Sequence, residues 1–300
     1  MSKTAVSSRR AAAPRSVLGP VLARLKGEPS RTWSIIITIY GDAVVPRGGS
    51  VWLGTLLAFF KALGISDGVV RTAMSRLAAD GWLERHRVGR NSFYRLAHKG
   101  RATFAAATEH IYAPSPRSFR GRFDLLLIGN GDDRDAVRDA LVAAGFGSPA
   151  AGVWVSPGGD IPDAARDVLR LEAGGDAAAL RALAARAWPL DATAQSYRRF
   201  ITTFTPIADA LENDAPLDDL EALVARVLLI HEYRRIVLRD PLLPAEVLPP
   251  DWPGAPAREL CARLYRKLVA PSERWLDANA IDETGATLPA NKDLGRRFLS

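Results

Sequence analysis

The sequence of 300 residues predicts a multidomain α+β fold. Residues 64–96 combine a basic amphipathic helical pattern with a basic hairpin pattern, residues 123–187 mix strand-like and helical runs, and the chain from Asp191 onward is helical in periodicity. We therefore expect a basic flexible tail over residues 1–30, a first folded unit over 31–113, an α+β unit over 114–190, a helical unit over 191–280 and a C-terminal tail over 281–300.

The helical pattern of the first unit begins at Ser66 or Asp67, either of which suits a helix N-terminus. An apolar stripe that recurs at three- and four-residue steps should face a core. It consists of Val70, Ala73, Met74 and Leu77. The opposite face carries small residues, hydroxyls and guanidiniums, which allow a helix to enter a DNA major groove and to contact phosphates and base edges.

The hairpin pattern follows Gly81 and turns at residues 88–91, where Gly89 and Asn91 suit a tight turn. Its strands carry Arg85, Arg87, Arg90 and Arg95. With helices expected at residues 32–40 and 52–63, this order predicts a winged helix-turn-helix that binds DNA. The residues expected to contact DNA are Gly68, Arg71, Thr72, Ser75, Arg76, Arg87 and Arg90. A solvated helix followed by an ordinary surface hairpin is the alternative.

The charge distribution supports nucleic-acid binding independently. Residues 1–120 hold 19 Lys and Arg and 6 Asp and Glu, whereas the rest of the chain holds 21 and 27. The basic excess therefore lies entirely in the N-terminal part, and it predicts binding to double-stranded DNA with strong salt dependence.

Composition excludes several classes of protein. A hydrophobic content of 48% is enough for a sizeable core, and the single cysteine, Cys261, rules out an internal disulfide framework and fits a reducing cytoplasm. No apolar run approaches the length of a membrane span, and the first 30 residues lack the pattern of a signal peptide. We expect a cytoplasmic protein with no membrane partner.

The rest of the chain predicts two further units. We expect a linking helix at 101–110 and a hinge at 113–116, then strands at 123–128, 152–156 and 168–172 with helices at 132–144 and 177–187. This order is compatible with a ferredoxin-like domain. Helices are then expected at 193–203, 217–238 and 257–279, and the prolines between residues 241 and 256 predict a stiff, non-helical connector.

Several motifs together resemble one family. They are Ile39-Tyr40-Gly41-Asp42, residues 45–49, Trp52-Leu53-Gly54, residues 70–83, 152–155, 197–200, 231–235 and 239–244, and Trp275-Leu276. This combination resembles the PaaX family of bacterial repressors of phenylacetate catabolism. The resemblance implies an N-terminal winged helix, a Cas2-like ferredoxin-like middle domain, a helical C-terminal domain and a homodimer released from DNA by an aryl-CoA thioester. One departure is Phe119-Arg120-Gly121-Arg122-Phe123, where the family pattern has Trp-Asp-Gly-x-Trp.

An acyl-CoA effector, most simply phenylacetyl-CoA, needs an aromatic slot for its acyl group and cations for its phosphates. The helical unit offers both kinds of side chain. The candidate effector residues are Trp188, Tyr197, Arg198, Arg199, His231, Tyr233, Arg234 and Arg235. The alternative is that these residues are core aromatics and surface arginines.

The residues do not favour an enzyme. His231-Glu232 lacks the second histidine of a metalloprotease helix, and the four histidines are not at metal-ligand spacing, so we expect neither a metal nor another cofactor. Asp124, with Asp132 and Asp133, leaves a Cas2-like metal-dependent nuclease as one alternative function. The second alternative is an architectural DNA-binding protein without an effector. Residues 129–132 form a turn more readily than a phosphate loop. We predict a dimeric repressor with a pseudo-palindromic operator.

Overall fold

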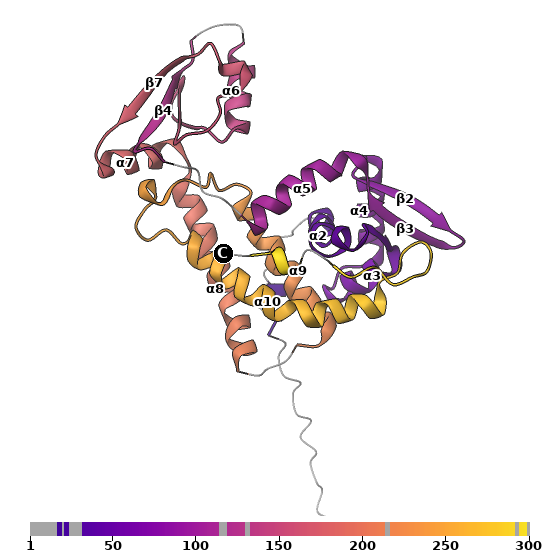
Figure 1. Ribbon diagram of the computed structural model, residues 1–300. Helices are drawn as coiled ribbons and strands as arrows, with labels where there is room; N and C mark the ends of the chain where they lie inside the picture. Colours follow the sequence, from indigo (N-terminus) through magenta and orange to yellow (C-terminus); the bar gives the residue numbers. More distant parts are fainter. Residues whose placement is uncertain are drawn as a thin grey trace, which may run out of the picture.

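The computed structural model describes residues 17–19, 21–23, 32–113, 119–129, 133–213, 217–291 and 294–298. It is an α+β protein with two small antiparallel sheets, of strand order β1-β3-β2 and β5-β6-β4-β7. The second sheet, with its two helices, stands apart from the larger body that contains the first (Figure 1). Most of the tail expected over residues 1–30, and the hinge prolines at 114 and 116, lie outside the described residues.

The first unit contains the expected helices and hairpin. It runs through α2 (Thr32–Ile39), a π-helical turn η1 (Tyr40–Val44), the 3-10 turn η2 (Val45–Arg47), β1 (Ser50–Trp52), α3 (Leu53–Ala62), α4 (Asp67–Ala79), β2 (Leu83–Val88), β3 (Asn91–Leu96) and α5 (His98–Tyr112). The sequence predicted the four helices and the hairpin, but not β1, the π-helical turn or the 3-10 turn η2. Strand β1 pairs with β3, with Val51 opposite Tyr94. This pairing holds the base of the hairpin against the helices.

Helix α4 has the two faces that its sequence predicts. Ser66 precedes it in extended conformation, and its apolar stripe is buried, with Val70 and Met74 fully excluded from solvent. The hairpin turns at Gly89, whose φ of +58° is a left-handed conformation that glycine adopts without strain. The predicted helix start and hairpin turn are therefore both confirmed.

The second unit contains β4 (Arg122–Leu127), α6 (Arg134–Ala143), β5 (Gly147–Ala150), β6 (Val153–Ser156), the 3-10 turn η3 (Asp163–Ala165), β7 (Leu169–Gly174) and α7 (Ala177–Ala187). The sequence did not predict β5, because Gly147-Ser148-Pro149 is poor in residues that favour strands. Gly147 is needed there, since a Cβ at this position would lie 2.5 Å from the Trp188 ring.

The third unit consists of α8 (Leu190–Glu212), α9 (Asp219–Val237), the 3-10 turn η4 (Ala245–Val247) and α10 (Gly254–Asn279), followed by the 3-10 turn η5 (Leu294–Arg296). Helix α8 continues past its predicted end at Thr203 even though it contains Pro206. Phe204 and Ile207 are buried on either side of this proline, and their packing offsets the lost backbone hydrogen bond. Among the described residues, no helix is long and apolar enough to span a membrane.

One hydrophobic core joins the first and third units. It extends from Leu18 to Phe298, and α9 contacts α2, α3 and α5 as well as α8 and α10. Figure 1 shows α9 and α10 lying directly beside the helices of the first unit. The second unit has two smaller cores, one on each side of its sheet, and one of them also contains Leu190, Leu243 and Val247 of the third unit. Helix α4 packs on α2 and α3, and α9 packs on the same two helices.

Candidate functional site

The outer face of α4 presents the predicted DNA-contacting residues to solvent. Gly68, Arg71, Thr72, Ser75 and Arg76 are all exposed. All but Gly68 join Ala79 in lining a shallow groove of about 390 Å³ along the helix. The structure thus brings these residues together on one solvent-facing surface, as a groove-binding helix requires.

The hairpin extends this surface with more positive charge. It projects away from the helical body beside α4 (Figure 1), and Arg87 and Arg90 near its tip are exposed. Arg95 binds Glu84 at 2.8 Å, and Arg85 donates to Ser92, so these two arginines brace the hairpin itself. In the part of the chain that the structure describes, no carboxylate lies within ion-pair distance of four other arginines. These are Arg71, Arg76, Arg87 and Arg90, which can meet phosphates without first breaking an ion pair.

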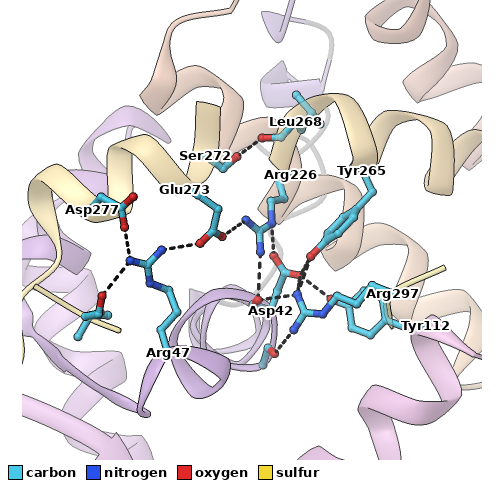
Figure 2. Close-up of polar contacts among 12 residues, drawn as sticks. Asp42, Arg47, Tyr112, Arg226, Tyr265, Leu268, Ser272, Glu273, Asp277 and Arg297 are labelled. Carbon is cyan, nitrogen blue, oxygen red and sulfur yellow. Dashed lines mark hydrogen bonds and ion pairs between the residues drawn. The ribbon is translucent and has the colours of Figure 1, made fainter. Parts of the chain in front are cut away.

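A buried network of charges fixes the first unit against the third (Figure 2). Asp42, in the π-helical turn, accepts a hydrogen bond from Arg226 Nε at 2.7 Å and from Arg297 at 2.6 Å. The hydroxyls of Tyr112 and Tyr265 also donate to its carboxylate, at 2.5 and 2.9 Å. Burial raises the pKa of the Asp42 carboxyl, but the two arginines and the two hydroxyls together lower it by more than burial raises it. The pKa of Asp42 therefore lies below its ordinary value. Asp42 is therefore a carboxylate held ionised in the core.

The π-helical turn adds a second acceptor at the same residue. The backbone carbonyl of Asp42 accepts hydrogen bonds from Arg226 at 3.1 Å and from Arg297 at 2.7 Å. A π-helical turn shifts the backbone hydrogen-bond register, and such turns recur where a protein needs an unusual polar arrangement. Here the turn lets one residue accept hydrogen bonds from two arginines, one in α9 and one close to the C-terminus.

The network continues through Arg47, which is almost completely buried. Its guanidinium donates to Glu273 at 2.5 Å, to the Leu288 carbonyl at 3.0 Å and to Asp277. Glu273 also accepts from Arg226 at 2.6 Å, so the two halves form one cluster. Sequence analysis did not find this cluster. The available signal was Arg226 itself, a single charge inside the apolar run from Ala222 to Ile230, because a buried charge requires partners.

The structure does not gather the eight predicted effector residues into one site. Trp188 is buried beside Phe123, and Tyr233 lies between Phe200 and Phe298. Tyr197 donates to Asp240 at 2.7 Å. Trp188 therefore lies in a different core from Tyr197 and Tyr233, which belong to the core shared by the first and third units.

The predicted cationic effector residues are also dispersed. Arg198 binds Asp251, Arg199 donates to Ser196, and Arg235 binds Glu232. His231 is buried, with Nδ1 2.9 Å from the Thr38 hydroxyl on α2, and desolvation with the charges of Arg234 and Arg235 lowers its pKa to about 3. Arg234 donates to Thr38 at 2.8 Å and to the Ser34 carbonyl at 2.8 Å. His231 and Arg234 thus tie α9 to α2.

A large cavity lies beside α4, on the side that faces the body. Its volume is about 900 Å³, and its walls come from α2, α4, α5 and α9. The aromatic and cationic lining residues are Trp33, Trp82, Phe104, Tyr112, Arg76 and Arg234. Of the eight predicted effector residues, Arg234 alone lines it. No local sequence pattern indicates this cavity, because its walls are contributed by four elements spread over more than half of the chain.

Among the residues weighed for catalysis, Asp124 has a structural partner. Asp124 lies within the sheet and binds Arg170 at 2.8 Å. Among the described residues, no three His, Cys, Asp or Glu side chains are grouped as they would be around a metal ion. Asp132 and residues 130 and 131 lie outside the described part of the chain.

Two family models, one curated relative and one solved structure are similar to this chain. The PaaX-like protein family model matches residues 31–100, and the PaaX-like protein C-terminal domain matches residues 188–278. Transcriptional repressor PaaX of Escherichia coli (strain K12) is 38% identical over 274 residues, which cover 86% of each chain. The solved structure of an uncharacterized Mycobacterium tuberculosis protein is 27% identical and covers 74% of this chain and 90% of its own, with a TM-score of 0.48.

The two matched regions are the unit that carries α4 with the hairpin and the helical unit that packs behind it. They are joined by the shared core and by the Asp42 network. The Escherichia coli relative is a transcriptional repressor, so this is a family of regulators and not of enzymes. The chain therefore belongs to the PaaX-like family of transcriptional repressors.

Proposed function

We propose that this PaaX-like repressor binds operator DNA in the cytoplasm as a homodimer and that an aryl-CoA thioester releases it, so controlling an operon for aromatic-acid catabolism. The observation that supports DNA binding most directly is the exposed face of α4 beside the basic hairpin, with arginines that no carboxylate neutralises in the described chain. This order of three helices and a hairpin is the one found in winged helix-turn-helix proteins. In such a unit α4 enters the major groove, and Arg87 and Arg90 lie along the phosphate backbone.

The strand order of the second unit supports a ferredoxin-like interpretation. Both sheets are antiparallel, and the order β5-β6-β4-β7 places the first and third strands of the unit at its centre. The second helix of the ferredoxin-like pattern is replaced by the 3-10 turn η3. A Cas2-like nuclease is not favoured, because Asp124 is already paired with Arg170.

We assign the dimer contact to the edge strand β7. Leu169 and Leu171 are exposed on it, and an exposed apolar edge is a site of strand pairing. A second copy paired antiparallel, with the two-fold axis at Leu171, would place Arg170 opposite Glu172 of the partner. Arg170 already binds Asp124, and Glu172 binds Arg122, so the pairing would extend an alternating row of charges. This charge complementarity favours a second copy of the chain as the occupant.

Sedimentation tests the dimer. Leu171→Lys should shift the protein to monomer, because it places two like charges on the axis. Val142→Lys is the matched control, since Val142 is exposed on α6 and away from β7. A Leu171→Lys protein that stays dimeric would place the contact elsewhere.

Operator release tests the effector. In gel shifts with the regulatory DNA upstream of a neighbouring aromatic-acid operon, phenylacetyl-CoA should weaken binding, whereas free CoA and phenylacetate should not. The phosphates of the thioester add charge-assisted hydrogen bonds that phenylacetate cannot make, and the ring adds apolar contacts that free CoA cannot make. If no acyl-CoA changes operator affinity, the protein is a DNA-binding repressor without this effector.

A further inference from the structure

The cavity beside α4 has the size and lining of a small-molecule site. Its volume of about 900 Å³ falls within the range of such sites, and its walls are mostly apolar. Ile37 from α2, Phe104 from α5 and Ile230 from α9 form part of the interior. Hydroxyls of threonines from α2, α4 and α5 supply scattered hydrogen-bonding groups, a mixture that orients a ligand without requiring many charges.

Apolar side chains are left uncovered on this lining. Trp33, Val69 and Leu238 are 44%, 49% and 38% exposed, and all three line the cavity. These side chains come from three separate elements and converge on one hollow, so they are not scattered surface residues. A concave apolar surface of this kind gains stability when a ligand covers it.

Two guanidiniums give the cavity a preference for anions. Arg234 is fixed by its bonds to Ser34 and Thr38, and no carboxylate in the described chain lies within ion-pair distance of it. Desolvation and the neighbouring Arg235 lower its pKa to about 10, which leaves it charged at neutral pH. Arg76 is exposed and likewise without a carboxylate partner among the described residues. Of the two lining carboxylates, Asp42 is neutralised by Arg226 and Arg297, and Asp80 is exposed.

The cavity and the DNA-facing groove share two residues of α4. Thr72 and Arg76 line both of them, so these side chains stand on the ridge between the two surfaces. The same helix contributes Val69, Ala73 and Leu77 to the cavity wall. A ligand that binds Arg76, or that shifts α4, therefore changes the surface that would meet DNA.

We propose that this cavity is the effector site, and that it holds the aromatic ring of an anionic ligand between α4 and α9, with the anionic part directed to Arg76 and Arg234. This inference rests on the effector-controlled repression proposed above and places that control at the back of the DNA-reading helix. Because ligand and DNA would compete for one position of α4, each should weaken the binding of the other by the same factor. The candidate residues Trp188 and Tyr197 would then have a structural role.

Filling the cavity tests the placement. Ala107 on α5 lines it, whereas Ala106 on the same helix is exposed and does not. With phenylacetyl-CoA as the probe in calorimetry, Ala107→Trp should raise Kd at least about tenfold, the effect of denying burial to one aromatic ring. Ala106→Trp should bind the probe as the unmodified protein does. Operator affinity without ligand should be unchanged in Ala106→Trp.

A second variant keeps the test independent of packing around Ala107. Trp33 is partly exposed, so the Trp33→Ala protein should fold normally. It should still bind the probe about tenfold more weakly, because the substitution removes one wall of the cavity that would hold the aromatic ring. Trp33→Phe should bind the probe but lose the part of the probe-induced change in tryptophan fluorescence that comes from Trp33, leaving the part that comes from Trp82. Undiminished binding by both Ala107→Trp and Trp33→Ala would overturn the inference.

The outcomes separate this inference from the proposed function. If the protein binds the probe in the cavity but binds no operator, the proposal of repression through this DNA is wrong, whereas the proposal of a ligand site in the cavity stands. If it binds operator but not the probe, the cavity is not an aryl-thioester site and the DNA-binding proposal stands. Saturating operator DNA should raise the Kd of the probe. The factor should equal the one by which saturating probe raises the Kd of the operator.

Discussion

Asp42 shows how much one buried carboxylate decides in this fold. It is 1% exposed and receives two guanidiniums, so removing its charge would leave Arg226 and Arg297 buried beside too few anions. We expect Asp42→Asn to lower the free energy of unfolding by about 3–5 kcal/mol, the usual effect of breaking a buried pair. Chemical denaturation would measure it. Asp251→Asn, which breaks an exposed pair with Arg198, should cost less than about 1 kcal/mol. Equal effects would contradict the assigned role.

Asp42 should also contribute to acid unfolding. Its folded pKa lies below the ordinary value of 3.8, so its contribution to stability is complete above that value and is lost as the pH falls through the folded pKa. In Asp42→Asn the acid limb of the stability curve below about pH 4 should therefore be less steep. The same denaturation series, repeated at several pH values, checks this.

His231 gives a second and separate pH dependence. Burial and the charges of Arg234 and Arg235 lower its pKa from 6.5 to about 3, so the unfolded chain takes up a proton that the folded protein refuses. The free energy of unfolding should therefore fall as the pH decreases from 6.5 towards 3. His231→Gln should reduce this slope, and His86→Gln, on the exposed hairpin, should not. An unchanged slope in His231→Gln would mean that the ring is protonated in the folded state.

At the scale of elements, α4 and the hairpin should contribute differently to DNA binding. Arg71→Ala on α4 should cost about 1–3 kcal/mol of operator affinity and relax sequence preference, because it removes a side chain that we propose contacts base edges. Arg90→Ala should weaken all sequences equally and reduce the slope of log K against log salt by about one, because it removes one phosphate contact.

Gel shifts at several salt concentrations measure both variants. Arg186→Ala is the control, since Arg186 is exposed on α7 in the second unit. If Arg71→Ala and Arg90→Ala behave alike, or both match the control, α4 does not read the operator as proposed.

At the scale of the whole molecule, the shared core makes the first and third units one cooperative structure. Helix α9 covers α2, α3 and α5, and its buried residues on all sides include Arg226 and His231. We expect a fragment of residues 31–113 to lack a cooperative thermal transition, because it would expose the faces of α2 and α3 and leave Asp42 without its arginines. Circular dichroism and two-dimensional NMR would test this. A well-dispersed spectrum from the fragment would show that the first unit folds alone.

The sequence determined what depends on near neighbours. Helical and alternating periodicity placed α4 and the hairpin correctly and located α7 at Ala177–Ala187, because burial of one face repeats every few residues. The same locality explains the errors. Strand β1 has three residues, too few to show a period, and β5 is stabilised by a distant tryptophan that local composition does not reveal.

The tertiary structure decided which distant residues meet. Asp42 and Arg226 are 184 positions apart, and their pairing follows from how α9 packs on α2 and α3. The exposed α4 surface was predictable because all of its residues lie on one helix, where helical periodicity alone decides which side chains share a face. The cavity behind it was not, since a hollow is defined by what four separate elements leave unfilled. Amphipathic patterns specify which face of an element is buried, but they do not specify the partner that buries it, and this chain's network and cavity depend on those partners.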